Sequence, residues 1–192
     1  VPWNDREAVA RALADHPVAA LLVEPVAANM GVVPPEEGFL EFLLAASRDA
    51  GALLVFDEVI TGFRVSRGGA QELYGVEPDL TVLGKVLGGG LPAAAFAGRR
   101  ELMERVAPTG DVYQAGTLSG NPLATAAGLA TLRRLDADAY RRLAELTDRL
   151  AAGLSRLAED QPLQLASVPG LLTLFFNSEP VADFAAAAAC DL

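Results

Sequence analysis

The 192-residue chain is poor in the side chains that form disulfides and structural metal sites. It has one cysteine, Cys190, and one histidine, His16. A single cysteine excludes an internal disulfide, and one thiol with one imidazole cannot supply the four ligands of a structural zinc site. Sparse cysteine is typical of proteins kept in a reducing compartment, so we expect a cytoplasmic protein.

Positive charge is also scarce. The chain carries 15 basic against 25 acidic residues, a formal net charge of −10. This balance argues against nucleic acid or an anionic membrane as a partner. No run of eighteen apolar residues is present, so we expect no membrane-spanning helix. With 52% hydrophobic residues the chain is too apolar to be disordered and can bury a core.

Lysine is the rarest charged residue. Fourteen of the fifteen basic residues are arginine, and the only lysine is Lys85. One explanation for the single lysine is chance, in a chain whose composition is biased towards arginine. The alternative is that Lys85 does what arginine cannot do, which is to become a neutral amine and bond covalently to a carbonyl group.

Hydrophobic patterning predicts an α/β fold in which helices and short apolar strands alternate. All-apolar strands between helices are typical of a largely parallel sheet covered by helices. The predicted helices span residues 4–15, where Asn4 and Glu7 form a capping box, and 36–50, 68–74, 99–106, 121–135 and 139–159. The predicted strands span residues 18–23, 52–56, 80–83, 93–97, 163–167 and 171–176.

Two ionisable residues follow predicted strands, at the edge where parallel sheets bind ligands. Asp57 follows one strand, and it interacts either with a ligand or, as a structural residue, with Arg64 or a helix terminus. Lys85 lies among apolar residues, which favour an uncharged, nucleophilic amine, and a glycine triplet follows closely. The alternative for Lys85 is an ordinary lysine extending from a strand end.

Common phosphate and hydrolase motifs do not fit. A P-loop needs glycine where Asp79 stands and a hydroxyl residue where Val86 stands. Residues 116–120 do not match the nucleophile motif of serine hydrolases. Gly116 and Thr117 precede a predicted helix, where they either bind an oxyanion such as phosphate or help Asn121 to cap the helix. Lysine, carboxylate and phosphate contacts together describe a site for an aldehyde cofactor.

These motifs resemble the class III pyridoxal-phosphate aminotransferases. The resemblance rests on residues 55–64, on residues 78–85 and on the glycine triplet that follows, in this order. Within the family, residues 24–31, 64–75 and 113–122 are most similar to the aminomutase branch. Membership implies a fold type I large domain, a pyridoxal 5'-phosphate cofactor and a homodimer with shared active sites. The branch converts glutamate 1-semialdehyde to 5-aminolevulinate, a tetrapyrrole precursor, by intramolecular amino transfer.

The resemblance also implies a role for each matching residue. Lys85 would bond to the cofactor aldehyde and move protons between cofactor and substrate carbons, and Asp57 would pair with the pyridine nitrogen. Val59 would pack under the ring, and Asn29 would reach the phenolic oxygen. The remaining matches are Gly116 and Thr117, as phosphate ligands of the neighbouring subunit, and Glu24, as a positioning acid.

The resemblance covers only the middle and later parts of much longer family members. Residues 1–135 would form part of the large cofactor domain, and residues 136–192 a connecting helix and the start of a small α+β domain. The chain begins with Val1, so we expect a fragment that is inactive alone and prone to aggregate. Two alternatives stay open: a two-substrate class III aminotransferase, and a non-catalytic α/β binding module.

Overall fold

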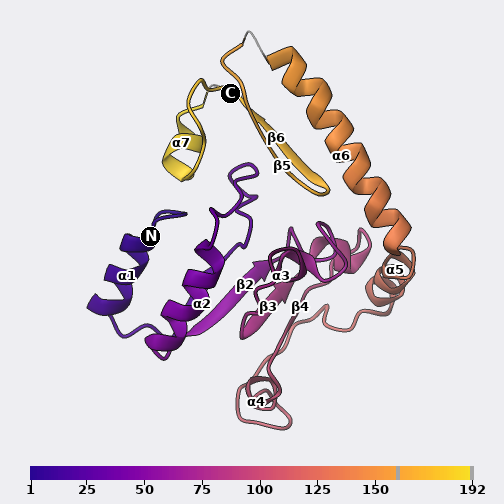
Figure 1. The fold of residues 1–192 in the computed structure, drawn as a ribbon. Helices are drawn as coiled ribbons and strands as arrows, with labels where there is room; N and C mark the ends of the chain where they lie inside the picture. Colours follow the sequence, from indigo (N-terminus) through magenta and orange to yellow (C-terminus); the bar gives the residue numbers. More distant parts are fainter. Residues whose placement is uncertain (159–160, 191–192) are drawn as a thin grey trace.

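A computed structural model describes residues 1–158 and 161–190, which form two sheets and the helices around them (Figure 1). The strands are β1 Ala20–Val23, β2 Leu53–Glu58, β3 Leu80–Leu83, β4 Ala95–Gly98, β5 Gln164–Val168 and β6 Leu171–Phe175. The helices are α1 Arg6–Asp15, α2 Phe39–Asp49, α3 Gly69–Tyr74, α4 Arg100–Met103, α5 Pro122–Leu132, α6 Ala137–Ala158 and α7 Phe184–Ala188, with a 3-10 turn, η1, at Lys85–Gly88.

The larger sheet has the strand order β1-β2-β3-β4. The first three strands run parallel and β4 runs antiparallel to β3, which confirms the expected α/β fold with a largely parallel sheet. The register pairs Val23 with Phe56 and Asp57 with Val82, so the carboxyl ends of β1, β2 and β3 lie along one edge.

One face of this sheet is covered better than the other. Burial alternates along β2, and its buried side chains are Leu54, Phe56 and Glu58. Leu54 and Phe56 belong to a core cluster with Val9, Phe39, Leu40, Leu43 and Val76, largely from α1 and α2. On the opposite face Leu22 is 68% exposed and Phe96 is 40% exposed, which leaves apolar surface uncovered.

The smaller sheet, β5-β6, is an antiparallel hairpin in the later part of the chain. It packs against loops of the larger sheet through two buried clusters. Val168 lies with Val26, Val32, Val65 and Ala70. Phe175 lies with Ala27 and Val33. Each sheet lies on its own side of the predicted domain boundary at 135/136, but the boundary itself stays a prediction.

The first helix begins differently from the sequence prediction. Its N-cap is Asp5, whose Oδ1 accepts a hydrogen bond from Ala8 N at 2.8 Å, so the expected Asn4–Glu7 capping box is wrong. Asn4 has a φ of 62°, and its Oδ1 accepts instead from Glu36 N at 2.9 Å. Asn4 therefore joins the loop before α2, a contact that local sequence rules cannot predict.

The predicted helices and strands are all present, with ends shifted by a few residues. The largest shifts are of three residues: α2 begins at Phe39, after Gly38 with a φ of 71°, and α4 and α5 end at Met103 and Leu132. The last residue of the helix predicted over 139–159 lies outside the described residues. In the described part of the chain, no helix is both long and apolar enough to span a bilayer.

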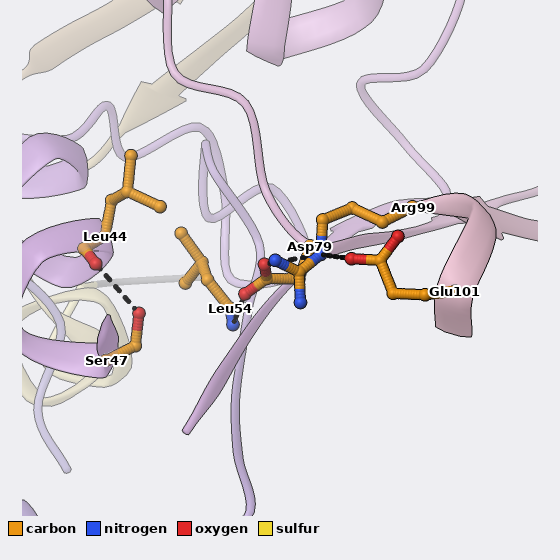
Figure 2. Close-up of polar contacts among 6 residues, drawn as sticks. All are labelled: Leu44, Ser47, Leu54, Asp79, Arg99 and Glu101. Atoms are coloured by element: carbon orange, nitrogen blue, oxygen red, sulfur yellow. Dashed lines mark hydrogen bonds and ion pairs between the residues drawn. The ribbon is translucent and has the colours of Figure 1, made fainter. Parts of the chain in front are cut away.

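Asp79 fixes the end of the sheet opposite the carboxyl edge. Figure 2 shows its carboxylate between β2 and the residues that follow β4. Asp79 Oδ2 accepts from Leu54 N at 2.8 Å, and Oδ1 lies 3.3 Å from Arg99 Nε. Arg99 also contacts Glu101 at 3.2 Å. Asp79, which directly precedes β3, thus links this strand to β2 and to the residues after β4.

Candidate functional site

The carboxyl edge of the sheet brings together residues from three strands. Glu24 directly follows β1, Asp57 lies near the end of β2, and Lys85 lies two residues beyond β3. The sequence predicted that Asp57 follows the strand. Asp57 instead lies inside it, because β2 continues to Glu58. The pairing of Asp57 with Val82 still places the carboxylate and the lysine on neighbouring parallel strands at this edge.

Asp57 is half-buried and belongs to the less covered face of the sheet, since its neighbours in β2, Phe56 and Glu58, are buried on the other face. Its Oδ1 accepts a hydrogen bond from Val59 N at 3.0 Å. Among the described residues Asp57 forms no ion pair with Arg64, so that structural alternative is not supported. The rest of the carboxylate is available to a ligand.

Lys85 begins the 3-10 turn η1 and has a φ of 43°, a left-handed conformation that is rare outside glycine. The residue is exposed, so its apolar neighbours in sequence do not bury it. Gly84 before it is extended, with a φ of −164°. Unusual backbone conformations of this kind often occur at functional sites.

Helix α5 packs directly on this turn through glycine. A Cβ on Gly128 would lie 2.2 Å from the carbonyl oxygen of Leu87. A Cβ on Gly89, whose φ is 58°, would lie 2.5 Å from the carbonyl oxygen of Ala127. Only glycine allows the two backbones to approach so closely. Helix α5 therefore supports the turn that carries Lys85.

Val59 lies close to Asp57, with which it shares a hydrogen bond of 3.0 Å, and close to the backbone before Lys85. A Cβ on Gly84 would lie 3.2 Å from Val59 Cγ1, so the backbone just before Lys85 contacts this side chain. Val59 is half-buried. The structure thus brings Asp57, Val59 and Lys85 to one place.

Asn29 and Glu24 lie on the loop between β1 and α2. Glu24 Oε2 accepts from Ala28 N at 3.0 Å, so this carboxylate holds its own loop. Asn29 is exposed near the tip of the loop. The loop starts at the same carboxyl edge as Asp57 and Lys85.

Gly116 and Thr117 lie on an exposed segment of the chain. Both are exposed in the segment between α4 and α5, and residues 111–120 are exposed throughout. Within the described chain no hydrogen bond joins either residue to Asp57 or Lys85. Asn121 caps α5, accepting from Leu123 N at 3.0 Å and Ala124 N at 3.1 Å, which confirms the helix-capping interpretation for Asn121.

Sequence reasoning missed Glu58, a fully buried carboxyl group. Its oxygens accept hydrogen bonds from Thr61 Oγ1 at 2.9 Å, Ala70 N at 2.6 Å, Gln71 N at 3.2 Å and Gln71 Nε2 at 3.0 Å. Glu58 ties the end of β2 to the first turn of α3, and so fixes the loop that begins with Val59. The only signal of this role in the sequence was a second acidic residue directly after Asp57, at the end of a strand.

A cavity of about 310 Å³ lies behind the Lys85 turn. Its wall includes Arg64 of the loop after β2, Val86 and Gly89 of η1, and Tyr140 of α6. The Tyr140 hydroxyl donates to the carbonyl oxygen of Phe63 at 3.0 Å. Burial raises the pKa of the Tyr140 hydroxyl above its usual value, with a smaller opposing effect of Arg67.

Comparison with known proteins decides the family. The model of the family described as aminotransferase class-III matches residues 4–188. The chain belongs to the class III aminotransferases. The sequence resemblance drawn from the Asp57 and Lys85 segments is therefore confirmed.

Among curated members of the family, similar relatives are named glutamate-1-semialdehyde 2,1-aminomutase. The protein of Thermomicrobium roseum is 56% identical over 100% of this chain and 46% of its own length. That of Aquifex aeolicus is 50% identical, with the same coverage. This class III aminotransferase chain thus spans 46% of the length of the curated relatives it matches.

Solved class III structures share the fold. A glutamate-1-semialdehyde aminomutase from Pseudomonas aeruginosa PAO1 in complex with PMP has a TM-score of 0.89 at 31% identity, over 100% of this chain and 45% of that one. A β-phenylalanine aminotransferase from Variovorax paradoxus has a TM-score of 0.92 at 34% identity, over 100% and 46%. The chain thus shares its α/β fold with these enzymes.

Proposed function

We propose that this chain carries the part of a pyridoxal 5'-phosphate site that includes the cofactor-binding lysine, Lys85. One observation carries the proposal: Asp57, near the end of β2, and Lys85, two residues beyond the neighbouring parallel strand β3, lie at the same carboxyl edge, with Val59 next to both Asp57 and Gly84. The residues present fit this cofactor chemically. A primary amine suits its aldehyde, and a carboxylate suits its ring nitrogen.

Each residue has a defined task in this proposal. Lys85 Nζ would hold the cofactor by condensing with its aldehyde, with loss of water, until a substrate amine takes its place. The freed Lys85 amine would then move protons between cofactor and substrate carbons. Asp57 accepts a hydrogen bond from the ring nitrogen and keeps it protonated. Val59 packs against the ring, Asn29 binds its phenolic oxygen, and Glu24 holds the Asn29 loop. A protonated ring supplies the electron sink that makes those protons labile.

We propose further that the complete protein exchanges amino groups within one substrate, converting glutamate 1-semialdehyde to 5-aminolevulinate. The support is the identity of 50% and 56% to curated aminomutases along the whole chain. The reaction is an isomerisation: an amino group enters the aldehyde carbon and another leaves the neighbouring carbon, so no second substrate is consumed.

A two-substrate aminotransferase is the second candidate. The β-phenylalanine aminotransferase and the aminomutase resemble this chain's fold almost equally, with TM-scores of 0.92 and 0.89. The lysine and acid discussed above serve both reactions. The two candidates differ in whether the complete protein needs an amino donor besides glutamate 1-semialdehyde.

We propose a cytoplasmic homodimer in which Gly116 and Thr117 bind the phosphate group of the partner's cofactor. Both residues are exposed, so they are accessible to a neighbouring subunit. Backbone amides and a hydroxyl suit an oxyanion.

Borohydride trapping tests the cofactor site. The protein is incubated with pyridoxal 5'-phosphate, reduced, and analysed by intact mass and peptide mapping. We expect one adduct on Lys85, because this is the only lysine in the chain and the α-amine is its only competitor here. Lys85→Arg keeps the charge and should remove the adduct.

The outcomes separate the candidates. An adduct that persists in Lys85→Arg, or no adduct in a folded protein, favours the non-catalytic binding module. With the adduct established, the full-length protein is given glutamate 1-semialdehyde alone. Formation of 5-aminolevulinate without added amino donor supports the aminomutase, and strict dependence on a donor supports the two-substrate enzyme.

A further inference from the structure

The loop that carries Asn29 is held by residues from the far end of the chain. Ala27 and Val33 pair across this loop, with N–H···O distances of 3.1 and 2.8 Å, and Asn29 lies between them near the tip. These two hydrogen bonds shape the loop. They do not fix its position relative to the rest of the molecule.

Strand β6 fixes the position of this loop relative to the rest of the molecule. Val32 N donates to Thr173 Oγ1 at 3.0 Å, across 141 residues of sequence. Val32 is only 4% exposed, so water cannot easily replace the hydroxyl. Phe175, two residues along the same strand, packs against Ala27 and Val33.

Gly31, in the same loop, lies against the ring of Phe175. Its φ is 96°, and a Cβ there would lie 2.5 Å from the ring of Phe175. The loop is therefore held by one partly buried hydrogen bond and by an aromatic ring that lies against a glycine of positive φ. Displacement of β6 by even an ångström would move the loop or break the hydrogen bond.

We propose that Thr173 is a positioning residue for the Asn29 loop, so that the β5-β6 hairpin sets the place of Asn29 at the cofactor site. The consequence for the cofactor rests on the function proposed above, whereas the hold on the loop does not. Thr173 acts through the loop backbone and touches neither cofactor nor substrate.

The contrasting explanation is that the hairpin merely covers apolar surface. In that case Phe175 would matter and the Thr173 hydroxyl would not. Thr173→Val separates the two, because valine keeps the shape and removes only the hydroxyl. Thr173→Ser keeps the hydroxyl and serves as the rescue variant. Ser167→Ala, which removes an exposed hydroxyl from β5, is the matched control.

Hydrogen exchange with mass spectrometry tests the hold on the loop in the full-length protein. We expect exchange of residues 26–33 to be roughly tenfold faster in Thr173→Val, since a buried amide loses its acceptor. Exchange in Thr173→Ser and Ser167→Ala should match the parent protein, and peptides of β2 should not change. Unaltered exchange in Thr173→Val overturns the proposal.

The link to the site is read from the visible absorption band of bound pyridoxal 5'-phosphate. We expect the pH midpoint of this band to shift in Thr173→Val in the same direction as in Asn29→Ala, and not in Thr173→Ser. Faster loop exchange with an unmoved midpoint overturns the positioning role. If Thr173→Val does not fold, Thr173→Ala replaces it, because it also removes the hydroxyl and leaves Phe175 in place, with the same two measurements and the same expected directions.

These measurements distinguish failure of the proposal from failure of the proposed function. A parent protein that binds no pyridoxal phosphate contradicts the cofactor site, and the exchange experiment then still decides whether Thr173 holds the loop. A normal cofactor band with unaltered exchange in Thr173→Val contradicts the positioning role alone.

Discussion

Glu58 shows how a single buried residue can shape a site that it does not touch. Its carboxyl group receives four hydrogen bonds from the loop after β2 and from α3. No space remains for a larger residue at Gly69, where a Cβ would lie 2.3 Å from Glu58 Oε2. Asp57, which precedes Glu58 in β2, is thereby held with its side chain on the opposite face.

Replacing one of these oxygens by an amide nitrogen is expected to be costly. In Glu58→Gln a donor would face two other donors, and we expect the free energy of unfolding to fall by about 2–4 kcal/mol. Denaturant unfolding measures this change. Glu41→Gln, on the exposed face of α2, is the control and should change stability by less than about 0.5 kcal/mol. Equal stabilities of the two variants would contradict the role of Glu58.

Tyr74 makes stability depend on alkaline pH. Burial raises the pKa of Tyr74 above 10.0, so the unfolded chain loses this proton at a lower pH than the folded protein. The unfolded state then binds fewer protons, and stability falls as pH rises through and above about 10. Urea unfolding at pH 8, 10 and 11 should show a smaller fall in Tyr74→Phe. Identical slopes in both proteins would refute this assignment.

At the scale of the element, the packing of α5 on η1 decides the position of Lys85. Glycine inside a helix ordinarily costs about 0.5–1 kcal/mol relative to alanine. Gly128 is retained against that cost because its Cα lies against the carbonyl group of Leu87.

Gly128→Ala should therefore destabilise the protein, since overpacking of about 1–3 kcal/mol exceeds the gain in helix propensity. Gly153→Ala is the matched control, because a Cβ at this helical glycine of α6 meets nothing within 4 Å. We expect Gly153→Ala to raise the melting temperature, Gly128→Ala to lower it, and the Lys85 adduct to form more slowly only in Gly128→Ala. A rise in melting temperature in both variants would contradict the packing argument.

At the scale of the whole molecule, apolar surface is left without cover. Leu22 and Phe96 lie exposed on one face of the larger sheet, and β1 and β4 form its open edges. Sheets with bare edges and apolar faces associate.

We expect the 192-residue chain alone to form species larger than 20.0 kDa. Leu22→Glu should weaken this association, because it places a charge on the uncovered face. Ala45→Glu adds the same charge to the exposed side of α2 and should have no such effect. Sedimentation velocity distinguishes these outcomes, and a monomeric parent chain would overturn the expectation.

Sequence alone determined the order of helices and strands and the convergence of Asp57 and Lys85 on one edge. Both follow from local information: apolar periodicity defines each element, and parallel strands bring their carboxyl ends to the same side. The positions of helix ends were less predictable, because Asn4 and Asp5 are both good caps and a contact with Glu36 decided between them.

Only the tertiary structure decided which residues support the site. The four donors around Glu58, the contact of Gly128 with Leu87, and the hydrogen bond from Val32 to Thr173 join segments separated by up to 141 residues. Such contacts leave no periodic signal in the chain, since each depends on how two elements pack after folding. The exposure of Lys85 was also decided by the folded structure, because the apolar residues around it in sequence do not bury it.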